Sequence, residues 1–321
     1  MEQLSQTNKQ LIDLLIKGTP NELICKKLGI NKESFKRRLE TLKRYGYNIN
    51  RQIYYNGTQK FVVSKQLTNA FTTLYGVPGN QVSFLFAADQ HIGSKKENLD
   101  YAKILYQFAV DNGYSIIINL GDIVEGLLNP HMHKTHLEQL YYFLENYPKD
   151  ERILNINVLG NHEGDFTRSL GIDLHTLLNE TAERDDIISL GFGVQRLRIG
   201  SDEITMAHQA RDLKSVDGTC KVSAHGHRYQ FKVDNYTPTM FCMTLSDETK
   251  DGFPPGFVSG DFLLDSTGRF HKVTFTQYLI LNNQIIKAGH NHFNFSTSSN
   301  PNTEKTYKKK YFSLKNHSIN I

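Results

Sequence analysis

Cysteine is scarce in this chain of 321 residues, and the three that occur, Cys25, Cys220 and Cys242, lie far apart. They form no CxxC pair, so the sequence argues against a disulfide framework and against a thiolate zinc site. No apolar run approaches the roughly 18 residues that a bilayer-spanning helix requires. The N-terminus has no basic segment followed by an apolar one, so we expect no signal peptide and no membrane partner. Together these absences predict a reduced, cytoplasmic protein.

The composition is that of a folded protein whose charge is unevenly distributed. Apolar residues make up 39% and charged residues 22% of the chain, which excludes a disordered or collagen-like protein, and the length suggests two domains. Residues 1–66 hold 13 lysines and arginines against five acidic residues, and residues 301–321 hold five against one. Residues 67–300 hold 19 against 27. The basic ends favour polyanions such as nucleic acid, and the acidic, histidine-containing middle favours cations.

The N-terminal fifth of the chain predicts three helices and a hairpin. Residues 11–16 and 20–28 have the pattern of two short helices, and a third is expected to begin at Lys32. In this third helix apolar residues recur at helical spacing, at Phe35, Leu39 and Leu42. Asn56-Gly57 between two β-prone runs is a strong hairpin signal.

This order of elements resembles a winged helix-turn-helix domain, in which the third helix enters the DNA major groove. The third helix is basic outside its apolar face, as phosphate contacts require, and we expect DNA contacts from Lys32, Lys36, Arg37, Lys43 and Arg44. A small helical domain for dimerisation or protein docking is the alternative, and the oligomeric state stays open, a homodimer included. We place this domain at 1–65 and a linker containing glycine and proline at 66–81.

Further along the chain, short apolar strands end in polar residues. The runs at 82–88, 114–120 and 152–159 alternate with helical stretches at about 97–111 and 134–146. This alternation predicts a mostly parallel sheet, whose strand ends meet at the edge where ligands bind. The residues that follow the three strands are Asp89-Gln90-His91, Gly121-Asp122 and Gly160-Asn161-His162-Glu163. Two later strands end in His208 and in Ala224-His225-Gly226-His227.

These motifs, in this order, resemble those of the calcineurin-like metallophosphoesterases of the nuclease and phosphodiesterase type, over residues 82–280. The resemblance implies an α/β fold with a β-sandwich flanked by helices (αββα), which we place at 82–290. The small α+β winged-helix domain precedes it, and a basic, partly flexible tail at 291–321 follows. Ala224 stands where the family usually has glycine, which alanine can replace if φ there is not positive.

The resemblance also implies a centre of two divalent metal ions that share Asp122. It assigns one ion to Asp89, His91, Asp122 and His227, and the other to Asp122, Asn161, His208 and His225. Carboxylate, amide and imidazole donors without thiolate favour Mn²⁺, with Fe or Zn²⁺ as alternatives. A shared carboxylate offsets the repulsion between two dications roughly 3.5 Å apart, and such a pair can activate water.

Four further residues are assigned from the same motifs. His162 matches the family's acid, which protonates the leaving oxygen, a role that suits imidazole near neutral pH. Glu125 and Glu163 are expected to support the metal ligands, and Arg168 to touch phosphate. A surface carboxylate and a surface cation are the alternatives for Glu163 and Arg168.

A DNA-binding domain joined to a phosphoester-cleaving domain is most simply explained if DNA is the substrate. We therefore expect a metal-dependent DNA nuclease or phosphodiesterase. A phosphatase of a protein or nucleotide, tethered to DNA, is less favoured because Leu159 stands where family phosphatases often carry arginine. A non-catalytic DNA-binding regulator is less favoured because every ligand and His162 are present. Fold analogy alone does not decide among them.

Overall fold

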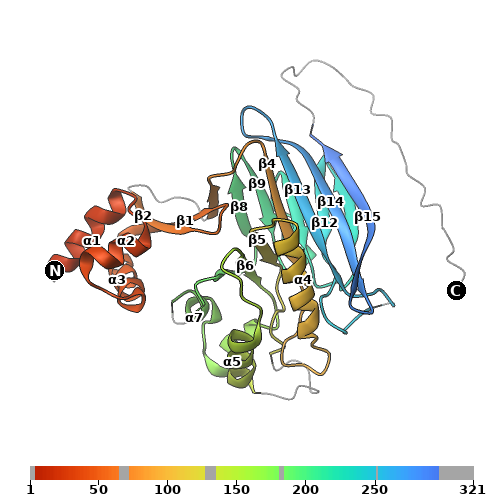
Figure 1. Cartoon of the computed structure of the whole chain (residues 1–321), viewed down its shortest axis with the longest axis horizontal. Helices are drawn as coiled ribbons and strands as arrows, with labels where there is room; N and C mark the ends of the chain where they lie inside the picture. Colours follow the sequence, from red (N-terminus) through yellow and green to blue (C-terminus); the bar gives the residue numbers. More distant parts are fainter. Residues whose placement is uncertain (1–3, 65–71, 127–134, 181–183, 251, 296–321) are drawn as a thin grey trace, which may run out of the picture.

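Two stacked β-sheets with helices against them form the body of the molecule, and a helical head lies at one end (Figure 1). The computed structural model describes residues 4–64, 72–126, 135–180, 184–250 and 252–295. The predicted α/β sandwich flanked by helices is confirmed. No helix of the described segments is long and apolar enough to cross a membrane.

The head contains the predicted three helices and hairpin. They are α1 (Gln6–Ile16), α2 (Asn21–Leu28), α3 (Lys32–Arg44), β1 (Asn48–Tyr54) and β2 (Gln59–Ser64). The side chain of Asn31 caps α3 by accepting a hydrogen bond of 2.8 Å from the backbone N–H of Ser34. The apolar faces of the helices meet in a small core, formed by Leu11, Ile12, Leu15, Ile24, Phe35, Leu39 and Leu42. The head therefore has a core of its own, although its role in DNA binding stays a prediction.

Within the described segments, one sheet of the body has seven strands in the order β15-β14-β13-β4-β5-β6-β7. Its central strands are parallel: β4 (Gln81–Ala87), β5 (Ile116–Asn119), β6 (Leu154–Leu159) and β7 (Ile187–Phe192). Antiparallel strands complete one side: β13 (Gly256–Leu264), β14 (Phe270–Leu281) and β15 (Gln284–Asn294). Since β15 continues to Asn294, the predicted start of the tail at residue 291 is too early. Residues 296–321, with most of that tail, lie outside the described segments.

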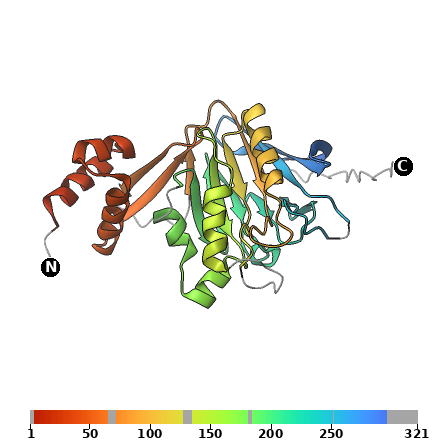
Figure 2. The same cartoon turned by 60° about the horizontal axis from the view of Figure 1, so that its bottom comes forward.

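The other sheet has eight strands among the residues that the structure describes, in the order β11-β12-β10-β9-β8-β3-β1-β2. Its body strands are β3 (Thr72–Tyr75), β8 (Gln195–Ile199), β9 (Asp202–Met206), β10 (Cys220–Ser223), β11 (Gln230–Asp234) and β12 (Thr237–Phe241). Strand β3 falls within the predicted linker 66–81 and pairs in parallel with β1, with Gln52 opposite Thr73. The hairpin of the head thus continues the sheet of the body, as the orange strands of Figure 2 show.

Alternating side chains of the central strands of the seven-stranded sheet enter two separate cores. In β4, Phe84 and Phe86 enter the core between the sheets, while Leu85 and Ala87 enter the core beneath the helices. The helices of the second core are α4 (Leu99–Asp111), α5 (His136–Asn146), α6 (Gly164–Leu170) and α7 (Leu174–Glu180). Ile53 of β1 is fully buried in the core between the sheets. A residue of the head's hairpin therefore belongs to the core of the body.

Candidate metal centre

The seven predicted metal ligands lie in loops at one edge of the sandwich. Asp89 and His91 follow β4, Asp122 follows β5, and Asn161 follows β6, so three loops come from the seven-stranded sheet. The other three ligands follow β9 and β10 of the eight-stranded sheet: His208, His225 and His227. Backbone hydrogen bonds hold neighbouring loops together, with Asp89 N–H donating to Gly121 C=O at 3.0 Å and Ala224 N–H to His208 C=O at 2.9 Å.

Five of these seven residues have left-handed backbone conformations that are unusual for residues other than glycine. The φ angles are 49° for Asp89, 49° for His91, 52° for Asp122, 65° for His225 and 57° for His227. Such conformations cost of order 1–3 kcal/mol each and persist where the surrounding structure enforces them, often at functional sites. Ala224 is not among the residues with positive φ, as its replacement of glycine requires.

Two glycines allow the loops to approach one another closely. A Cβ atom at Gly160 would lie 2.2 Å from Asp122 Oδ1, and one at Gly121 would lie 2.7 Å from His208 Nδ1. Gly121 also has a φ of 97°, which L-residues rarely adopt. Glycine in the Gly-Asp and Gly-Asn-His motifs therefore makes room for the ligand side chains.

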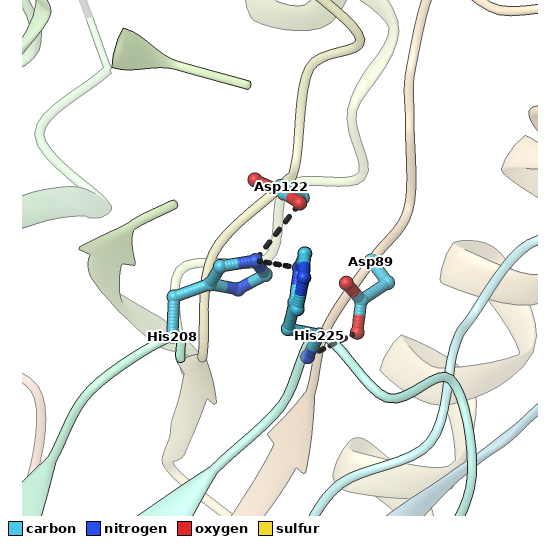
Figure 3. Close-up of side chains that lie close together, drawn as sticks. All are labelled: Asp89, Asp122, His208 and His225. Carbon is cyan, nitrogen blue, oxygen red and sulfur yellow. Dashed lines mark hydrogen bonds and ion pairs between the residues drawn. The ribbon is translucent and has the colours of Figure 1, made fainter. Parts of the chain in front are cut away.

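One group of side chains, drawn in Figure 3, contains Asp89, Asp122, His208 and His225. His208 Nε2 lies 2.9 Å from Asp122 Oδ2 and 3.1 Å from His225 Nδ1. The backbone N–H of His225 donates to Asp89 Oδ2 at 3.2 Å. One ligand atom of each of the four lies within 4.8 Å of those of the others, which is close enough to surround a metal ion.

A second group contains Asp89, His91 and His227, and a third contains His91, Asp122 and His162. His227 Nε2 lies 3.5 Å from Asp89 Oδ1. The second group shares Asp89 with the first cluster and the third shares Asp122, so both groups lie beside it. Asp89 and Asp122 each appear in two of the groups, so both carboxylates stand between neighbouring candidate metal positions.

Hydrogen bonds to the outer nitrogens fix the histidine rings. His208 Nδ1 lies 2.8 Å from the carbonyl oxygen of Leu120, and His227 Nδ1 lies 2.6 Å from that of Glu248. A carbonyl can only accept, so both Nδ1 atoms carry the proton. In the neutral form of each ring, Nε2 would then be free to offer its lone pair to a metal ion, which is the arrangement that metal-binding histidines adopt.

Buried atoms of two candidate ligands, Asp89 Oδ1 and His91 Nε2, make no hydrogen bond within the described part of the chain. Buried polar atoms without partners are costly and need an explanation. Divalent cations would complete their coordination, and the oxygen and imidazole donors suit Mn²⁺, Fe or Zn²⁺. The residues present therefore fit a metal centre.

The buried carboxylates and imidazoles shift one another's pKa values. Burial disfavours the charged ring of His208, but the hydrogen-bonded carboxylate of Asp122 outweighs it and raises the pKa of His208 to about 9. Burial has the same effect on His91, and there the carboxylate of Glu125, 2.9 Å from Nδ1, helps raise the pKa to about 9. Burial would raise the pKa of Asp122, but His208 holds it well below its usual value. In the metal-free protein, the positive charge of the protonated histidines offsets the negative charge of the carboxylates.

Glu163 binds the backbone of the neighbouring loops and is not a surface carboxylate. Its side chain is buried and accepts hydrogen bonds from four N–H groups: Asp122 at 3.0 Å, Ile123 at 2.5 Å, Val124 at 3.0 Å and Gly160 at 2.7 Å. Three of these donors are 39 to 41 residues away in the sequence. Glu163 therefore holds the loop that carries Asp122 against the loop that carries Asn161.

His162 lies beside the candidate metal positions and is partly accessible. Its ring centre is 4.6 Å from that of His91, and its Nε2 is 3.8 Å from Asp122 Oδ2. Its Nδ1 is hydrogen-bonded to the carbonyl oxygen of Glu125 and must carry a proton. The 17% exposure of its side chain leaves a route for a substrate to reach the ring.

The other predicted site residues near the centre make hydrogen bonds or ion pairs with neighbouring residues. Asn161 Oδ1 accepts a hydrogen bond of 2.9 Å from Gln209 Nε2, a partner that the motifs do not predict. Glu125 is fully buried and contacts His91. Arg168 is ion-paired with Asp165 and donates to the carbonyl oxygen of Asn161 at 3.2 Å. Arg168 thus lies on the Asn161 loop, with 58% of its side chain exposed.

The five basic residues of α3 do not form one face. Lys32 and Lys36 are directed toward the body and pair with Asp185, Lys36 at 3.7 Å, while Lys43 pairs with Glu40 on α3 itself. At roughly 100° per residue, Arg37 and Arg44 fall on a neighbouring face, and both are exposed. The pairing of Lys32 and Lys36 with Asp185 could not be predicted from the sequence, because Asp185 is 153 residues from Lys32.

Comparison with known proteins gives likeness to solved structures only. No protein-family model and no curated protein match the chain. The chain is similar to vacuolar protein sorting 29 from Cryptosporidium parvum, with 14% identity over 68% of this chain and 100% of that one, at a TM-score of 0.41. A predicted phosphoesterase from Streptococcus pneumoniae has 12% identity over 68% of this chain and 100% of that one, at a TM-score of 0.40.

An archaeal phosphodiesterase has 15% identity over 59% of this chain and 97% of its own, at a TM-score of 0.38. With identities and TM-scores this low, the function has to be argued from the site itself.

Proposed function

We propose that this chain is a hydrolase that cleaves phosphodiester bonds of DNA with two divalent metal ions sharing Asp122. The observation that carries the proposal is the convergence of two carboxylates and four histidines from both sheets on one edge of the sandwich. Within the described part of the chain, Asp89 Oδ1 and His91 Nε2 lack hydrogen bonds there, and a cation would give both atoms a partner. A purely structural cluster would satisfy these atoms within the protein.

The proposed ligand sets are those that the sequence motifs imply. Asp89, His91, Asp122 and His227 would hold one ion, and Asp122, Asn161, His208 and His225 the other. When bound, two such ions lower the pKa of a water molecule and stabilise the attacking and leaving oxygens of a phosphoryl group. Mn²⁺ is the proposed metal, since these oxygen and imidazole donors suit it.

His162 is the proposed acid for the leaving oxygen. Its Nδ1–H is committed to the carbonyl oxygen of Glu125, so only the doubly protonated ring carries a proton on Nε2. Nε2 is the nitrogen that faces the centre, 3.8 Å from Asp122 Oδ2. The imidazolium can therefore donate from Nε2 to a leaving oxygen, while Glu125 keeps the ring in place.

The head is the proposed DNA-binding part. Arg37 and Arg44 are the candidate phosphate contacts, because they lie on the exposed face of α3. Lys32 and Lys36 are better placed to fix the head against Asp185 of the body. The Arg37→Ala/Arg44→Ala variant should weaken binding of duplex DNA, whereas an unchanged affinity and salt dependence would reject this role.

The test of the proposed activity is Mn²⁺-dependent cleavage of single- and double-stranded DNA by the full-length protein, with His162→Ala as the control. Cleavage by the wild type that the variant loses would support the proposal. Absence of cleavage, with a small aryl phosphate monoester still hydrolysed, would replace it with a DNA-tethered phosphatase. Absence of both reactions with metal bound would favour a non-catalytic regulator.

A further inference from the structure

An acidic side chain that the sequence motifs do not include lies beside the candidate metal centre. Glu248 stands in the segment between β12 and β13, 21 residues after His227. Its carboxylate oxygen Oε2 lies 3.9 Å from His91 Nε2. His91, Glu125 and Glu248 offer ligand atoms within 4.8 Å of one another, as the residues of the other candidate groups do. The Glu248 side chain is 37% exposed, so it lies at the margin of the centre.

The nitrogen of His91 that Glu248 approaches is the one available to a metal ion. The other ring nitrogen, Nδ1, lies 2.9 Å from Glu125 Oε2. Nε2 is buried and makes no hydrogen bond within the described part of the chain. Bonds from a metal ion to imidazole nitrogen or carboxylate oxygen are about 2.0–2.2 Å long, so two ligands of one ion lie at most about 4.3 Å apart. The 3.9 Å between His91 Nε2 and Glu248 Oε2 therefore allows one ion to bind both atoms.

The backbone of Glu248 orients a second ligand of the same proposed ion. Its carbonyl oxygen accepts a hydrogen bond of 2.6 Å from His227 Nδ1. His227 Nε2 lies 3.5 Å from Asp89 Oδ1, and these two residues form one candidate group with His91. Glu248 thus contacts one ligand of this group with its main chain and lies beside another with its side chain.

A chain of hydrogen bonds ties the main chain at Glu248 to the loop that carries Asp89. Thr244 Oγ1 donates its proton to the carbonyl oxygen of Asp89 at 2.7 Å. Thr244 Oγ1 also lies 2.8 Å from Ser246 Oγ, which must be the donor there because the threonine proton is already used. The backbone N–H of Glu248 donates to Ser246 Oγ at 3.2 Å. Both hydroxyl groups belong to fully buried residues, so the position of Glu248 relative to Asp89 is fixed.

The ligand set proposed for this ion has room for one more donor. Its four residues supply four ligand atoms, whereas Mn²⁺ favours about six, mostly oxygen. A carboxylate oxygen from Glu248 would still leave a position for water or substrate. Asp89 and Asp122 supply two negative charges for two dications, so a third carboxylate beside the ions is electrostatically favourable.

We propose that Glu248 is an additional ligand, through one carboxylate oxygen, of the ion that His91 and His227 would hold. This inference rests on the metal centre of the proposed function and adds to it a residue from outside the sequence motifs. The alternative is an exposed carboxylate that does not touch the metal ion, and it predicts that Glu248 can be replaced without loss of Mn²⁺ affinity.

The test is Mn²⁺ binding by the full-length protein, measured by isothermal titration for the wild type and for Glu248→Ala. The variant should raise the Kd of one of the two ions at least about tenfold, the smallest loss typical of residues that only support metal ligands. Its melting temperature without metal should stay close to that of the wild type, because the Glu248 carboxylate is beyond hydrogen-bond distance of His91.

The matched control is Glu151→Ala, which also removes an exposed carboxylate. Glu151 precedes β6 and the ligand Asn161 follows it, so the six residues of the strand separate the two by about 20 Å. This variant should bind both ions like the wild type. Equal Kd values for Glu248→Ala and Glu151→Ala would overturn the inference.

Anomalous scattering from crystals soaked in limiting Mn²⁺ shows which ion is affected. The peak beside His91 and His227 should weaken in Glu248→Ala, and in wild-type crystals it should lie about 2.0–2.2 Å from a Glu248 oxygen. A wild-type peak more than about 3 Å from both oxygens of Glu248 would overturn the inference even if the Kd changes.

Hydrolysis of bis(4-nitrophenyl) phosphate by the wild type is measured separately, because it reports on the proposed function. Mn²⁺ binding that depends on Glu248 without this hydrolysis would refute the activity and keep the ligand. Hydrolysis by the wild type together with unchanged Mn²⁺ affinity in Glu248→Ala would refute the ligand and keep the activity.

Discussion

Replacing Glu163 with glutamine tests whether its carboxylate builds the metal centre. One oxygen accepts hydrogen bonds from the N–H groups of Ile123 and Val124, and the other from those of Asp122 and Gly160. Glutamine keeps one oxygen and turns an NH₂ group toward two donors, so two hydrogen bonds to a charged acceptor are lost. At about 1.5–3 kcal/mol each, the expected loss in the free energy of unfolding is about 3–6 kcal/mol.

At about 2–4 °C per kcal/mol for a domain of this size, the melting temperature should fall by at least about 6 °C. Mn²⁺ affinity should fall as well, because the loop carrying Asp122 loses its anchor. The assays are thermal unfolding without metal and isothermal titration with Mn²⁺. Glu145→Gln, the same change on the exposed face of α5, should alter stability by less than about 0.5 kcal/mol. If Glu163→Gln has the same melting temperature and the same Mn²⁺ affinity as Glu145→Gln, the Glu163 carboxylate does not hold the loop that carries Asp122.

Three further predictions address catalysis, protonation and the head. His162→Ala should bind Mn²⁺ normally but lower kcat about 10²–10⁴-fold, most for poor leaving groups; a uniform loss across leaving groups would reject the ring as the acid. His91 and His208 have pKa values of about 9, so both rings are protonated at pH 7. Because each ring must lose a proton to bind a metal ion, the affinity for Mn²⁺ should rise with pH up to about 9. Titration calorimetry in buffers of different ionisation enthalpy should show close to one proton released per ion, and no release would contradict the assigned ligands. Ile53→Ala should cost about 2–5 kcal/mol in denaturant unfolding, far more than Ile286→Ala on the exposed strand β15, if the hairpin belongs to the core of the body.

The residues that follow each strand could be predicted because their pattern is local. Apolar runs predict buried strands, and parallel strands of one sheet bring their ends to one edge, which is why Asp89 and Asp122 meet in the structure. The left-handed backbone of the ligands could not be predicted in this way. It depends on contacts between loops, such as the close approach of Gly160 to Asp122.

Features of the fold that depend on residues far apart in the chain could not be predicted from the sequence. The parallel pairing of β1 with β3 turns the predicted hairpin of the head into part of the body's sheet, and it places Ile53 in the core between the sheets. Deleting residues 1–66 would therefore remove Ile53, a residue of the body's core, along with the head. In the same way, Asp185 takes Lys32 and Lys36 away from the face that α3 alone would present to DNA.

The most direct test of the metal centre is the anomalous scattering from crystals soaked in Mn²⁺. We expect two peaks roughly 3.5 Å apart, one beside His91 and His227 and the other beside His208 and His225, with Asp122 in contact with both. Crystals of Asp122→Asn should lose both peaks, and that variant should not hydrolyse phosphodiesters. A single peak, or two peaks of which neither contacts Asp122, would contradict the proposed dinuclear centre.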